Sequence, residues 1–422
     1  MRIRLVSSLL PALALLLGIA QPAAAQRRQP RVTVPKSSLA LPADAGHRFH
    51  TNVLIAGQGP IGPAGQAVPQ AGGPPFSGYF YETPASLACL YNLVYSGGST
   101  SGCNPNVVDA NPNGGSRAIA IVDAYDDPNA VSDLNNFIAQ FALAPARFEV
   151  VYAAGNNPGL DPTGGWELEE SLDIEYAHAM APHARLFLVE AASNNTGDLL
   201  TAETVAAHLV AKAGGGEVSN SWGGEEFTTE TAYDSTFVQR GVVFFASAGD
   251  GPGTIWPSTS PNVVAAGGTS TNRDPNLGNF LYEGAWDDGG GGPSEVEPRP
   301  AYQNGIAAIA GAARVVPDIS SDANPNTGVW VLDTNLYEGE AGGWFIVGGT
   351  SVSSPTLAGI VNAAGTFHKS SAEELSVIYS LGFVVGYNDV QANNCGPYGG
   401  YLATRGYDFC AGVGSPHGYF SK

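Results

Sequence analysis

The stretch "RAIAIVDAY" (117–125) is a run of small and branched apolar residues that contains an aspartate near its end. A continuous apolar run of this length is typical of a strand buried on both faces, as in a parallel sheet. Apolar residues at helical spacing follow in "VSDLNNFIAQFAL" (131–143), and "RFEVVYA" (147–153) predicts the next strand. The order strand, helix, strand indicates a parallel βαβ unit.

The same alternation continues toward the C-terminus. Helices are predicted at 166–180, 198–214, 231–241 and 354–368, and strands at 184–191, 216–223, 242–250 and 262–268. We therefore expect an α/β fold whose largely parallel sheet carries helices on both faces. One domain is expected over residues 79–422.

The N-terminus has the features of a secretory signal peptide over residues 1–25. Arg2 and Arg4 precede an apolar run, and Ala23–Ala25 offer a small-residue cleavage site. A membrane anchor is the weaker interpretation, because the run is short and Pro11 interrupts it. Residues 26–78 are rich in Pro and Gly and predict a linker or a short pro-segment. The expected mature protein is secreted and free of the membrane.

The chain of 422 residues is acidic, with 18 Lys+Arg against 38 Asp+Glu and a formal charge of −20. This balance argues against nucleic acid and anionic membranes as partners, since both require a basic face. Two interpretations of the low Lys and Arg content stay open. One is tolerance of acid, where few fixed positive charges remain to repel one another, and the other is simple solubility.

The four cysteines allow three disulfide pairings. We favour the two local ones, Cys89–Cys103 and Cys395–Cys410, because short loops close most easily. A zinc site is less favoured, since neither pair has the tight spacing of a structural site.

Candidate chemical groups lie where predicted strands end, which is where open parallel sheets place their functional side chains. Asp123, Asp250 and the stretch "SNSWGG" (219–224) occupy such ends. Ser351, in "GGTSVSSPTLAG" (348–359), lies at a turn entering a helix. Backbone N–H groups there would point toward an incoming carbonyl oxygen.

A serine nucleophile needs a base, and the helix at 166–180 offers carboxylates. Glu169 and Asp173 are four residues apart and share a face, while Glu170 and Asp173 are three apart and are also neighbours. Like charges at this spacing raise at least one pKa. The interspersed Leu168 and Leu172 indicate that this helix is partly buried. The histidines are interpreted as surface or packing residues: His47, His50, His178, His183, His208, His368 and His417.

Several stretches, in this order, resemble the sedolisins, the serine-carboxyl peptidases. They are "TPASLACLYNL" (83–93), "EESLDIEYAHAMAPHARLFLVEA" (169–191), "SNSWGG", "FFASAGDGPGTIWPSTSPNVVAAGGTS" (244–270), "GGTSVSSPTLAGIV" (348–361), and "YNDV" with "TRGYDFCAGVGSP" (387–390 and 404–416). The resemblance covers most of residues 80–422. It implies a subtilisin-like fold in which glutamate and aspartate replace the histidine-based pair.

The resemblance assigns roles to four residues. Ser351 would be the nucleophile, Glu169 the general base and then the acid, and Asp173 its support. Asp250 would stand at the oxyanion position, where an ionised carboxylate would repel and a protonated one would donate a hydrogen bond. The resemblance therefore implies activity in acid.

Further residues follow from the same comparison. Ser221, Trp222 and Gly223 would bind substrate. Asp123 is expected to hydrogen-bond into the Glu169 network, with Trp222 nearby, or else to be a turn-forming residue.

One structural Ca²⁺ is implied at the C-terminus. Its hard oxygen ligands would be the carboxylates of Asp389 and Asp408 and the carbonyls of Val390, Thr404 and Gly406.

Two features depart from the family pattern. Gly349 stands where a serine usually precedes the Thr-Ser pair, a change that is conservative in size. In addition, about fifty residues separate the predicted signal peptide from the domain, where sedolisins usually have a long folded pro-domain.

The predicted function is a secreted, monomeric endopeptidase that cleaves peptides or unfolded proteins at acidic pH through an acyl-enzyme on Ser351. Endopeptidase and tripeptidyl-peptidase are not separated by the sequence. One alternative is a histidine-dependent, subtilisin-like protease that uses Asp123 and His178 at neutral pH. The other is a non-catalytic, calcium-stabilised binding protein on a protease fold.

Overall fold

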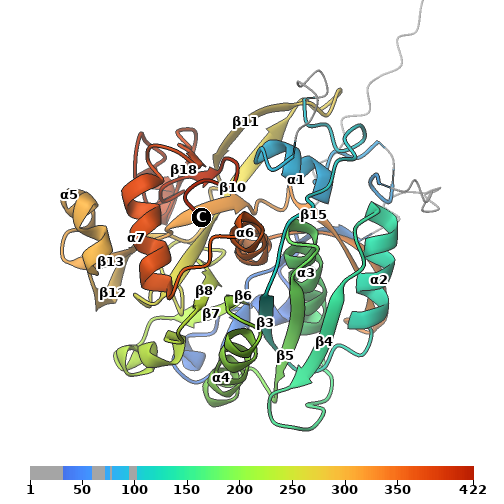
Figure 1. The fold of residues 1–422 in the computed structure, drawn as a ribbon, viewed down its shortest axis with the longest axis horizontal. Helices are drawn as coiled ribbons and strands as arrows, with labels where there is room; N and C mark the ends of the chain where they lie inside the picture. Colours follow the sequence, from blue (N-terminus) through green and yellow to red (C-terminus); the bar gives the residue numbers. More distant parts are fainter. Residues whose placement is uncertain (1–31, 59–71, 77, 95–101) are drawn as a thin grey trace, which may run out of the picture.

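A central sheet of eight strands organises the molecule (Figure 1). The computed structural model describes residues 32–58, 72–76, 78–94 and 102–422. The sheet runs β11-β10-β8-β6-β3-β5-β4, with β14 also paired to β10. Its strands are β3 (Ala118–Ala124), β4 (Arg147–Tyr152), β5 (Arg185–Ala191), β6 (Gly216–Asn220), β8 (Val242–Ser247), β10 (Val263–Arg273), β11 (Phe280–Ala285) and β14 (Ile319–Asp322). All pairs are parallel except β10 with β11, which confirms the predicted fold class.

Alternate residues of β3 supply both halves of the core. Ile119 and Ile121 pack on the side of α2 (Ala130–Phe141) and α3 (Gly165–Met180). Ala120 and Val122 face the other side, where α4 (Thr196–Lys212) covers the sheet. Because successive strand residues point to opposite faces, a run that is apolar throughout requires cover on both.

Helix α6 (Thr350–Ala364) packs closely against α3, and together they position the candidate site. A Cβ added at Gly359 would lie 2.7 Å from the Cβ of Met180 and 2.9 Å from the Ala177 carbonyl oxygen. Glycine is therefore required at this crossing, since any side chain would push the two helices apart.

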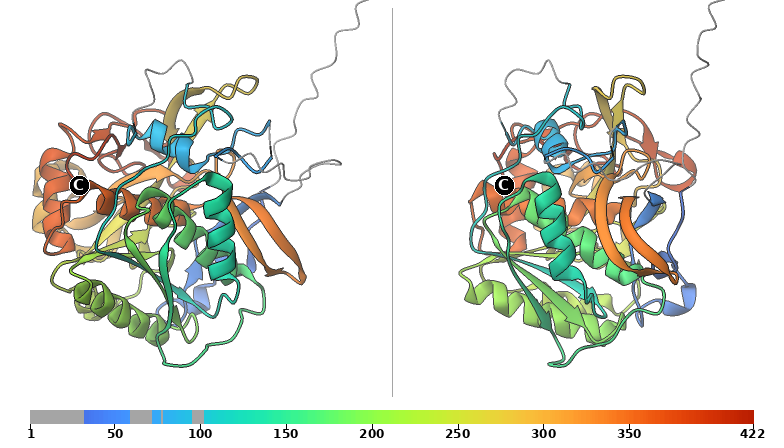
Figure 2. Two further views of the ribbon diagram at one scale, coloured as in Figure 1. Left: turned by 45° about the vertical axis from the view of Figure 1, so that its right-hand side comes forward. Right: turned by 90° about the vertical axis from the view of Figure 1, so that its right-hand side faces the viewer.

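Two three-stranded sheets lie beside the central one. One contains β15 (Val329–Tyr337), β16 (Glu340–Gly348) and β2 (Leu54–Gln58), and the other contains β1 (His50–Thr51), β7 (Trp222–Glu225) and β9 (Ile255–Trp256). Figure 2 shows the orange β15–β16 hairpin beside the blue N-terminal segment. Part of the expected linker, residues 32–58, thus packs against the domain. The predicted signal peptide, residues 1–25, lies outside the described residues. So do residues 26–31, 59–71 and 77 of the expected linker.

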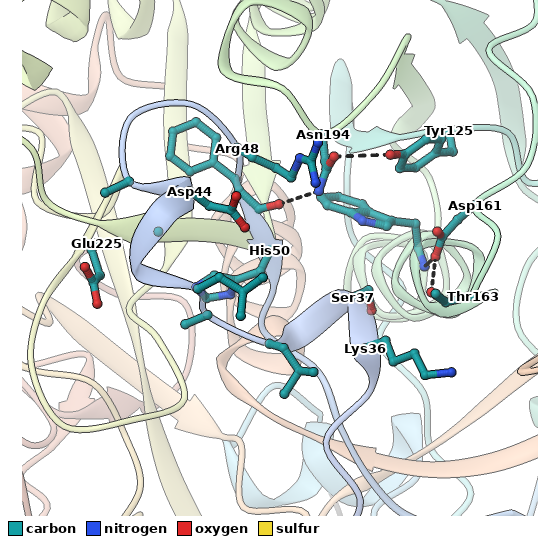
Figure 3. A pocket seen from close by; sticks show the side chains of 17 residues that line it. Lys36, Ser37, Asp44, Arg48, His50, Tyr125, Asp161, Thr163, Asn194 and Glu225 are labelled. Carbon is teal, nitrogen blue, oxygen red and sulfur yellow. Dashed lines mark hydrogen bonds between the residues drawn. The ribbon is translucent and has the colours of Figure 1, made fainter.

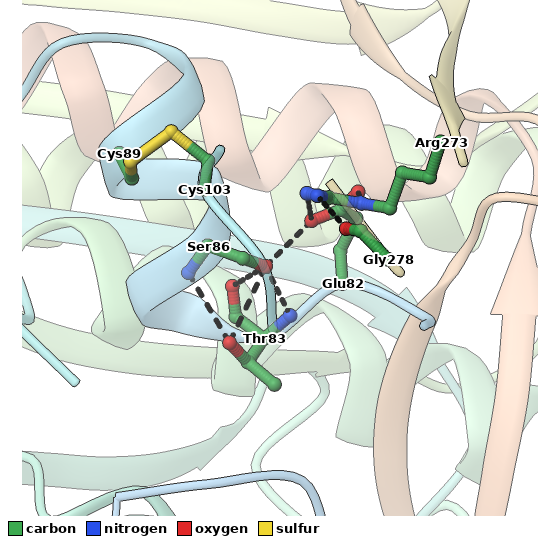
Figure 4. Close-up of a disulfide and its surroundings, with 7 residues drawn as sticks. All are labelled: Glu82, Thr83, Ser86, Cys89, Cys103, Arg273 and Gly278. Carbon is green, nitrogen blue, oxygen red and sulfur yellow. Dashed lines mark hydrogen bonds and ion pairs between the residues drawn. A yellow bond between two sulfur atoms is a disulfide. The ribbon is translucent and has the colours of Figure 1, made fainter. Parts of the chain in front are cut away.

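Both predicted disulfides are confirmed. Cys89–Cys103 ties α1 (Pro84–Leu90) to the following loop, beside the Glu82–Arg273 ion pair (Figure 4). Cys395–Cys410 joins two C-terminal loops. The remaining elements are α5 (Ala307–Ala310), α7 (Ser371–Leu381), β12 (Gly292–Pro298), β13 (Ala313–Val316), β17 (Tyr387–Asn388), β18 (Asn394–Cys395), β19 (Tyr401–Leu402), β20 (Ser415–Pro416) and the 3₁₀ helices Lys36–Ser38, Pro42–Asp44, Glu230–Phe237, Ala301–Ile306 and Pro397–Gly399.

Three element predictions differ from the structure. The helix expected at 231–241 is a 3₁₀ helix over Glu230–Phe237. The strand expected at 216–223 breaks at Ser221 into β6 and β7, which belong to different sheets. Helix α6 begins at Thr350, before the predicted start at 354, and contains Pro355. Among the described residues no helix is both long and apolar enough to cross a membrane.

Candidate active site

Ser351 lies in the first turn of α6, directly after β16, and is fully buried. Its hydroxyl donates to the Ser221 carbonyl at 3.2 Å. The carbonyl of Ser351 in turn accepts the Ser221 hydroxyl at 3.3 Å. Pro355, four residues further on, has no N–H to occupy that carbonyl, so the helix leaves it available to Ser221.

Glu169 and Asp173 project from one face of α3 toward Ser351. Asp173 accepts a hydrogen bond from the Ser221 hydroxyl at 2.7 Å. Both oxygens of Glu169 are buried without a hydrogen-bond partner among the described residues. Burial raises the pKa of Glu169 well above its usual value, the charges of Asp173 and Asp123 raise it further, and the nearby Ser351 hydroxyl opposes the shift. Burial likewise raises the pKa of Asp173, with the Ser221 hydroxyl opposing. Both carboxyls are therefore harder to ionise than isolated ones, and their repulsion favours a state in which the pair carries one negative charge.

Glu170 faces a different group of acids. Burial raises its pKa, and the charges of Glu190 and Asp127 are the largest contributions after burial. The Ser351 hydroxyl affects the pKa of Glu169 and is not among the causes of the shift of Glu170. The structure therefore distinguishes Glu169 from Glu170, which helical spacing alone does not.

Asp250 follows β8 and meets the start of α6. Its Oδ1 accepts hydrogen bonds from the Thr350 backbone N–H at 2.6 Å and from the Thr350 hydroxyl at 2.8 Å. Its Oδ2 is buried and unpartnered among the described residues. Burial raises the pKa of Asp250 to about 7, against the effect of both Thr350 bonds.

The backbone at Gly349 explains why this position has no side chain. Its φ is +103°, which side-chain-bearing residues rarely adopt. A Cβ there would lie 2.1 Å from the carbonyl oxygen of Asn52 and 2.4 Å from Asp250 Oδ2. Glycine is needed because two oxygens converge on that point.

Asp123 lies at the end of β3, fully buried. Burial is the main cause of its raised pKa, and the charge of Asp173 is the next largest cause. Asp123 therefore interacts electrostatically with the acid pair on α3. The expected hydrogen bond is not seen, because neither Asp123 oxygen has a partner among the described residues. The indole of Trp222 donates to the neighbouring Val122 carbonyl at 2.9 Å.

His178 lies on the same helix as Glu169 but in a different environment. Nine residues separate the two positions in sequence, which at ~1.5 Å per residue is roughly 13 Å along the axis. Its Nε2 is bonded to the Ala144 carbonyl at 2.8 Å, and burial lowers its pKa to about 4. This placement gives no support to a histidine base.

The C-terminal residues predicted to bind calcium meet in one loop pair. Asp389 accepts from the Gly406 N–H at 3.1 Å, and Asp408 accepts from the Thr404 N–H at 2.8 Å. Burial raises the pKa of Asp408 to about 6, and the charge of Asp389 contributes to the rise. The hydrogen-bond partners of both carboxylates include backbone N–H groups, and their oxygens are of the type that a hard cation binds. Within the described ranges, no cluster of three or more His, Cys, Asp or Glu side chains forms a metal site.

The predicted substrate strand lies beside Ser351, and a segment of the chain itself pairs with it. β1 runs antiparallel to β7, with His50 opposite Gly223 and Thr51 opposite Trp222. Sequence reasoning missed this segment and the residue it ends on, Asn52. The apolar run "NVLIAG" (52–57) within the Pro- and Gly-rich region was the available signal.

The chain is similar in sequence to known proteins. The chain is 31% identical over 338 residues to Kumamolisin from Bacillus sp. (strain MN-32), covering 72% of this chain and 59% of that protein. It is 26% identical over 355 residues to Sedolisin from Pseudomonas sp. (strain 101), covering 74% and 58%. The chain thus spans about three fifths of the length of these relatives. No family model matches.

Among solved structures, the chain resembles Pseudomonas sedolisin, a serine-carboxyl proteinase, in a complex with two molecules of pseudo-iodotyrostatin. The TM-score is 0.62 at 23% identity, and the match covers 80% of this chain and 95% of that one. Fold and site together define a subtilisin-like α/β protein whose buried serine is surrounded by carboxyls. The chain belongs to the sedolisin family of serine-type, Ser-Glu-Asp peptidases.

Proposed function

We propose that this chain is a serine-carboxyl endopeptidase that cleaves peptide bonds at acidic pH. The observation that carries the proposal is the convergence of Ser351, the Glu169–Asp173 pair and the free Oδ2 of Asp250 at the start of α6. Ser351 lies on α6 and the acid pair on α3, all three buried, whereas Asp250 is half-buried in the loop after β8. Such a set supplies a nucleophile, a base and an oxyanion donor.

Each residue has one role in the proposed reaction. The Ser351 hydroxyl turns from the Ser221 carbonyl to Glu169, which takes its proton as the oxygen attacks the substrate carbonyl. Glu169 then gives the proton to the leaving amine, and Asp173 shares the charge with it. The Ser351 N–H and protonated Asp250 hold the oxyanion, and one such donor contributes about 3 kcal/mol. Water releases the acyl group by the reverse sequence.

The pH dependence follows from Asp250. Its pKa of about 7 keeps the carboxyl protonated, and able to donate, below that pH. Above it the carboxylate repels a developing oxyanion. Activity should therefore fall as the pH rises through about 7.

The first experiment measures hydrolysis of an unfolded protein across roughly pH 2 to 8, a range that spans carboxylate and histidine pKa values. Wild type, Ser351→Ala and Glu169→Gln are compared with Glu170→Gln as the matched control. Activity confined to acid, lost in the first two variants and kept in Glu170→Gln, is the expected result. A neutral optimum that survives Glu169→Gln would contradict the proposal.

We also propose one structural Ca²⁺ in the C-terminal loop, held by Asp389, Asp408 and neighbouring carbonyls. A chelator should lower the melting temperature, and added Ca²⁺ should restore it. Asp389→Asn should lose this response, whereas Asp274→Asn, at an exposed loop carboxylate, should keep it. An unchanged melting temperature in wild type would reject the ion.

We propose, finally, that the protein is secreted, from the basic and apolar pattern of residues 1–25. Expression in a bacterial host with detection in the medium or periplasm tests this. An unprocessed chain confined to the cytoplasm would reject it.

A further inference from the structure

The backbone of residues 50–52 lies along the candidate cleft as an extended peptide. Its pairing with β7 places His50 against Gly223. The Asn52 N–H donates to the Ser221 carbonyl at 3.0 Å, and the Asn52 carbonyl accepts from the Ser351 N–H at 3.1 Å. The N–H of a nucleophilic serine is a recurrent oxyanion donor. One specific carbonyl of this chain therefore occupies the position that a reacting carbonyl requires.

The second proposed oxyanion donor lies near the same carbonyl. The Asn52 carbonyl oxygen and Asp250 Oδ2 both lie close to the point where a Gly349 Cβ would be, at 2.1 Å and 2.4 Å. Asp250 Oδ2 has no hydrogen-bond partner among the described residues, so a proton on it is available to this carbonyl.

The chain continues past the serine on the other side. Val53 is fully buried, and β2 then pairs antiparallel with β16, with Leu54 opposite Gly348 and Ile55 opposite Val347. Strand pairing on both sides of one peptide bond holds the Asn52–Val53 bond across the start of α6. An extended peptide fixed in this way needs little further ordering before reaction.

Two side chains of the segment occupy built pockets. Phe49 is 1% exposed, and its ring centroid lies 5.3 Å from that of Trp222 and 5.2 Å from that of Trp256. Asn52 Nδ2 donates to the Ser247 hydroxyl at 2.7 Å, at the end of β8. These contacts provide recognition of an aromatic residue and of a side-chain amide, three residues apart.

The segment is anchored further upstream as well. The Phe49 N–H donates to the Asn194 carbonyl at 3.0 Å, and Asn194 Nδ2 donates to the Phe49 carbonyl at 2.8 Å. Figure 3 shows Asn194 between the segment and Tyr125, whose hydroxyl donates to it at 3.1 Å.

We propose that the protein cuts its own chain between Asn52 and Val53, and that its cleft selects peptides with Phe and Asn at the positions of Phe49 and Asn52. The inference rests on the proposed peptidase function. The Ser351 oxygen bonds to the Asn52 carbonyl carbon, and the bond to the Val53 nitrogen breaks. The hydroxyl proton passes through Glu169 to that nitrogen. One water molecule then hydrolyses the ester and leaves a carboxyl group on Asn52 and a free amine on Val53.

The test follows the intact mass of the full chain after transfer from neutral pH to roughly pH 4, near the carboxylate pKa range. Wild type should yield a new N-terminus at Val53, with a rate constant that does not change on tenfold dilution. Ser351→Ala should stay intact. Val53→Pro should stay uncut at this bond, because its nitrogen is in a ring, whereas the matched Val53→Ala should be cut.

A double-mutant cycle tests the recognition. Asn52→Leu and Ser247→Ala should each slow cleavage about tenfold, the effect of one hydrogen bond of about 1.4 kcal/mol. Combining them should add little, because both remove the same contact. Additive effects would overturn the assignment of Ser247.

Other outcomes separate this inference from the proposed function. Cleavage elsewhere, or a rate proportional to protein concentration, would overturn the inference and leave the peptidase proposal intact. If wild type stays uncut and inactive, the Phe49→Ala variant is assayed next. This change removes the packing of Phe49 against Trp222 and Trp256 and so weakens binding of the segment. Activity in that variant would show a peptidase whose segment is not its substrate. Inactivity in both at every pH would reject the peptidase itself.

Discussion

The two oxygens of Asp250 have different environments. This difference explains how a carboxylic acid can donate a hydrogen bond to an oxyanion. Oδ1 accepts two hydrogen bonds from Thr350, so the proton belongs on Oδ2, which is buried without a partner among the described residues. A carboxylic acid held neutral in this way is a hydrogen-bond donor at the site where negative charge develops.

Asp250→Asn should therefore keep much of the activity and extend it upward in pH. The amide oxygen can accept both Thr350 bonds while the NH₂ group donates without needing a proton from solution. The measurement is kcat/KM of a peptide between roughly pH 4 and 8, chosen to bracket the carboxylate range. Asp250→Ala should lose about a hundredfold or more at every pH. A fall at the same pH in Asp250→Asn and wild type would place the limiting group elsewhere, at Glu169 or Asp173.

At the scale of elements, a buried ion pair ties β13 to the edge of the sheet. Arg314 donates to both Asp318 oxygens at 2.6 and 2.5 Å, and all these atoms are buried. Asp318 also accepts from the Ala265 N–H of β10 and from the Tyr379 hydroxyl of α7.

Arg314→Met should destabilise the protein by about 3–5 kcal/mol, because it leaves a buried carboxylate without its cation. Urea unfolding of Ser351→Ala protein with and without the change measures this. Lys36→Met is the control, since its pair with Glu338 is exposed (side chains 62% and 43%) and should contribute less than about 1 kcal/mol. Equal effects of the two changes would contradict the argument.

Some of the helices and strands could be predicted from the sequence, and others could not. The parallel strands and central helices were predictable because a strand such as β3 is apolar at every position. The break at Ser221 and the early start of α6 were not. Both arise from a tertiary contact, the exchange of hydrogen bonds between Ser221 and Ser351. The choice of Glu169 came from family resemblance, since spacing treats Glu170 alike. The cleft segment at 50–52 was missed because the one local signal, the apolar run at 52–57, lies in a Pro- and Gly-rich region and the strand's partner is some 170 residues away.

At the scale of the whole molecule, buried Asp and Glu side chains outnumber buried Lys and Arg side chains among the described residues. Burial raises the pKa of several carboxyls outside the serine site: to about 8 for Glu167, Glu203 and Glu374, and to about 7 for Asp333. In the folded state these groups prefer to be neutral, which is the form that acid supplies.

Stability should therefore be greatest in acid and fall toward neutral pH. A carboxyl whose folded pKa is raised binds more protons when folded than when unfolded between its two pKa values. Its contribution is fully present below the unfolded pKa of about 4 and is lost as the pH rises through the folded value. The free energy of unfolding of Ser351→Ala, which avoids self-digestion, should decrease between roughly pH 4 and 8. A rise over that range would contradict the burial of these acids in neutral form. A measured decrease would favour acid tolerance over simple solubility as the meaning of the low Lys and Arg content.

The strand β1 in the cleft is part of the same chain as Ser351, and this connection sets the terms on which any other peptide can bind. A ligand joined by a short tether competes at an effective concentration in the millimolar range, whatever the dilution of the protein. Once the bond after Asn52 is cut, the fragment that ends on Asn52 loses its tether and competes only at the concentration of the protein itself. For a micromolar solution this is about a thousandfold decrease in competitor, produced by one turnover.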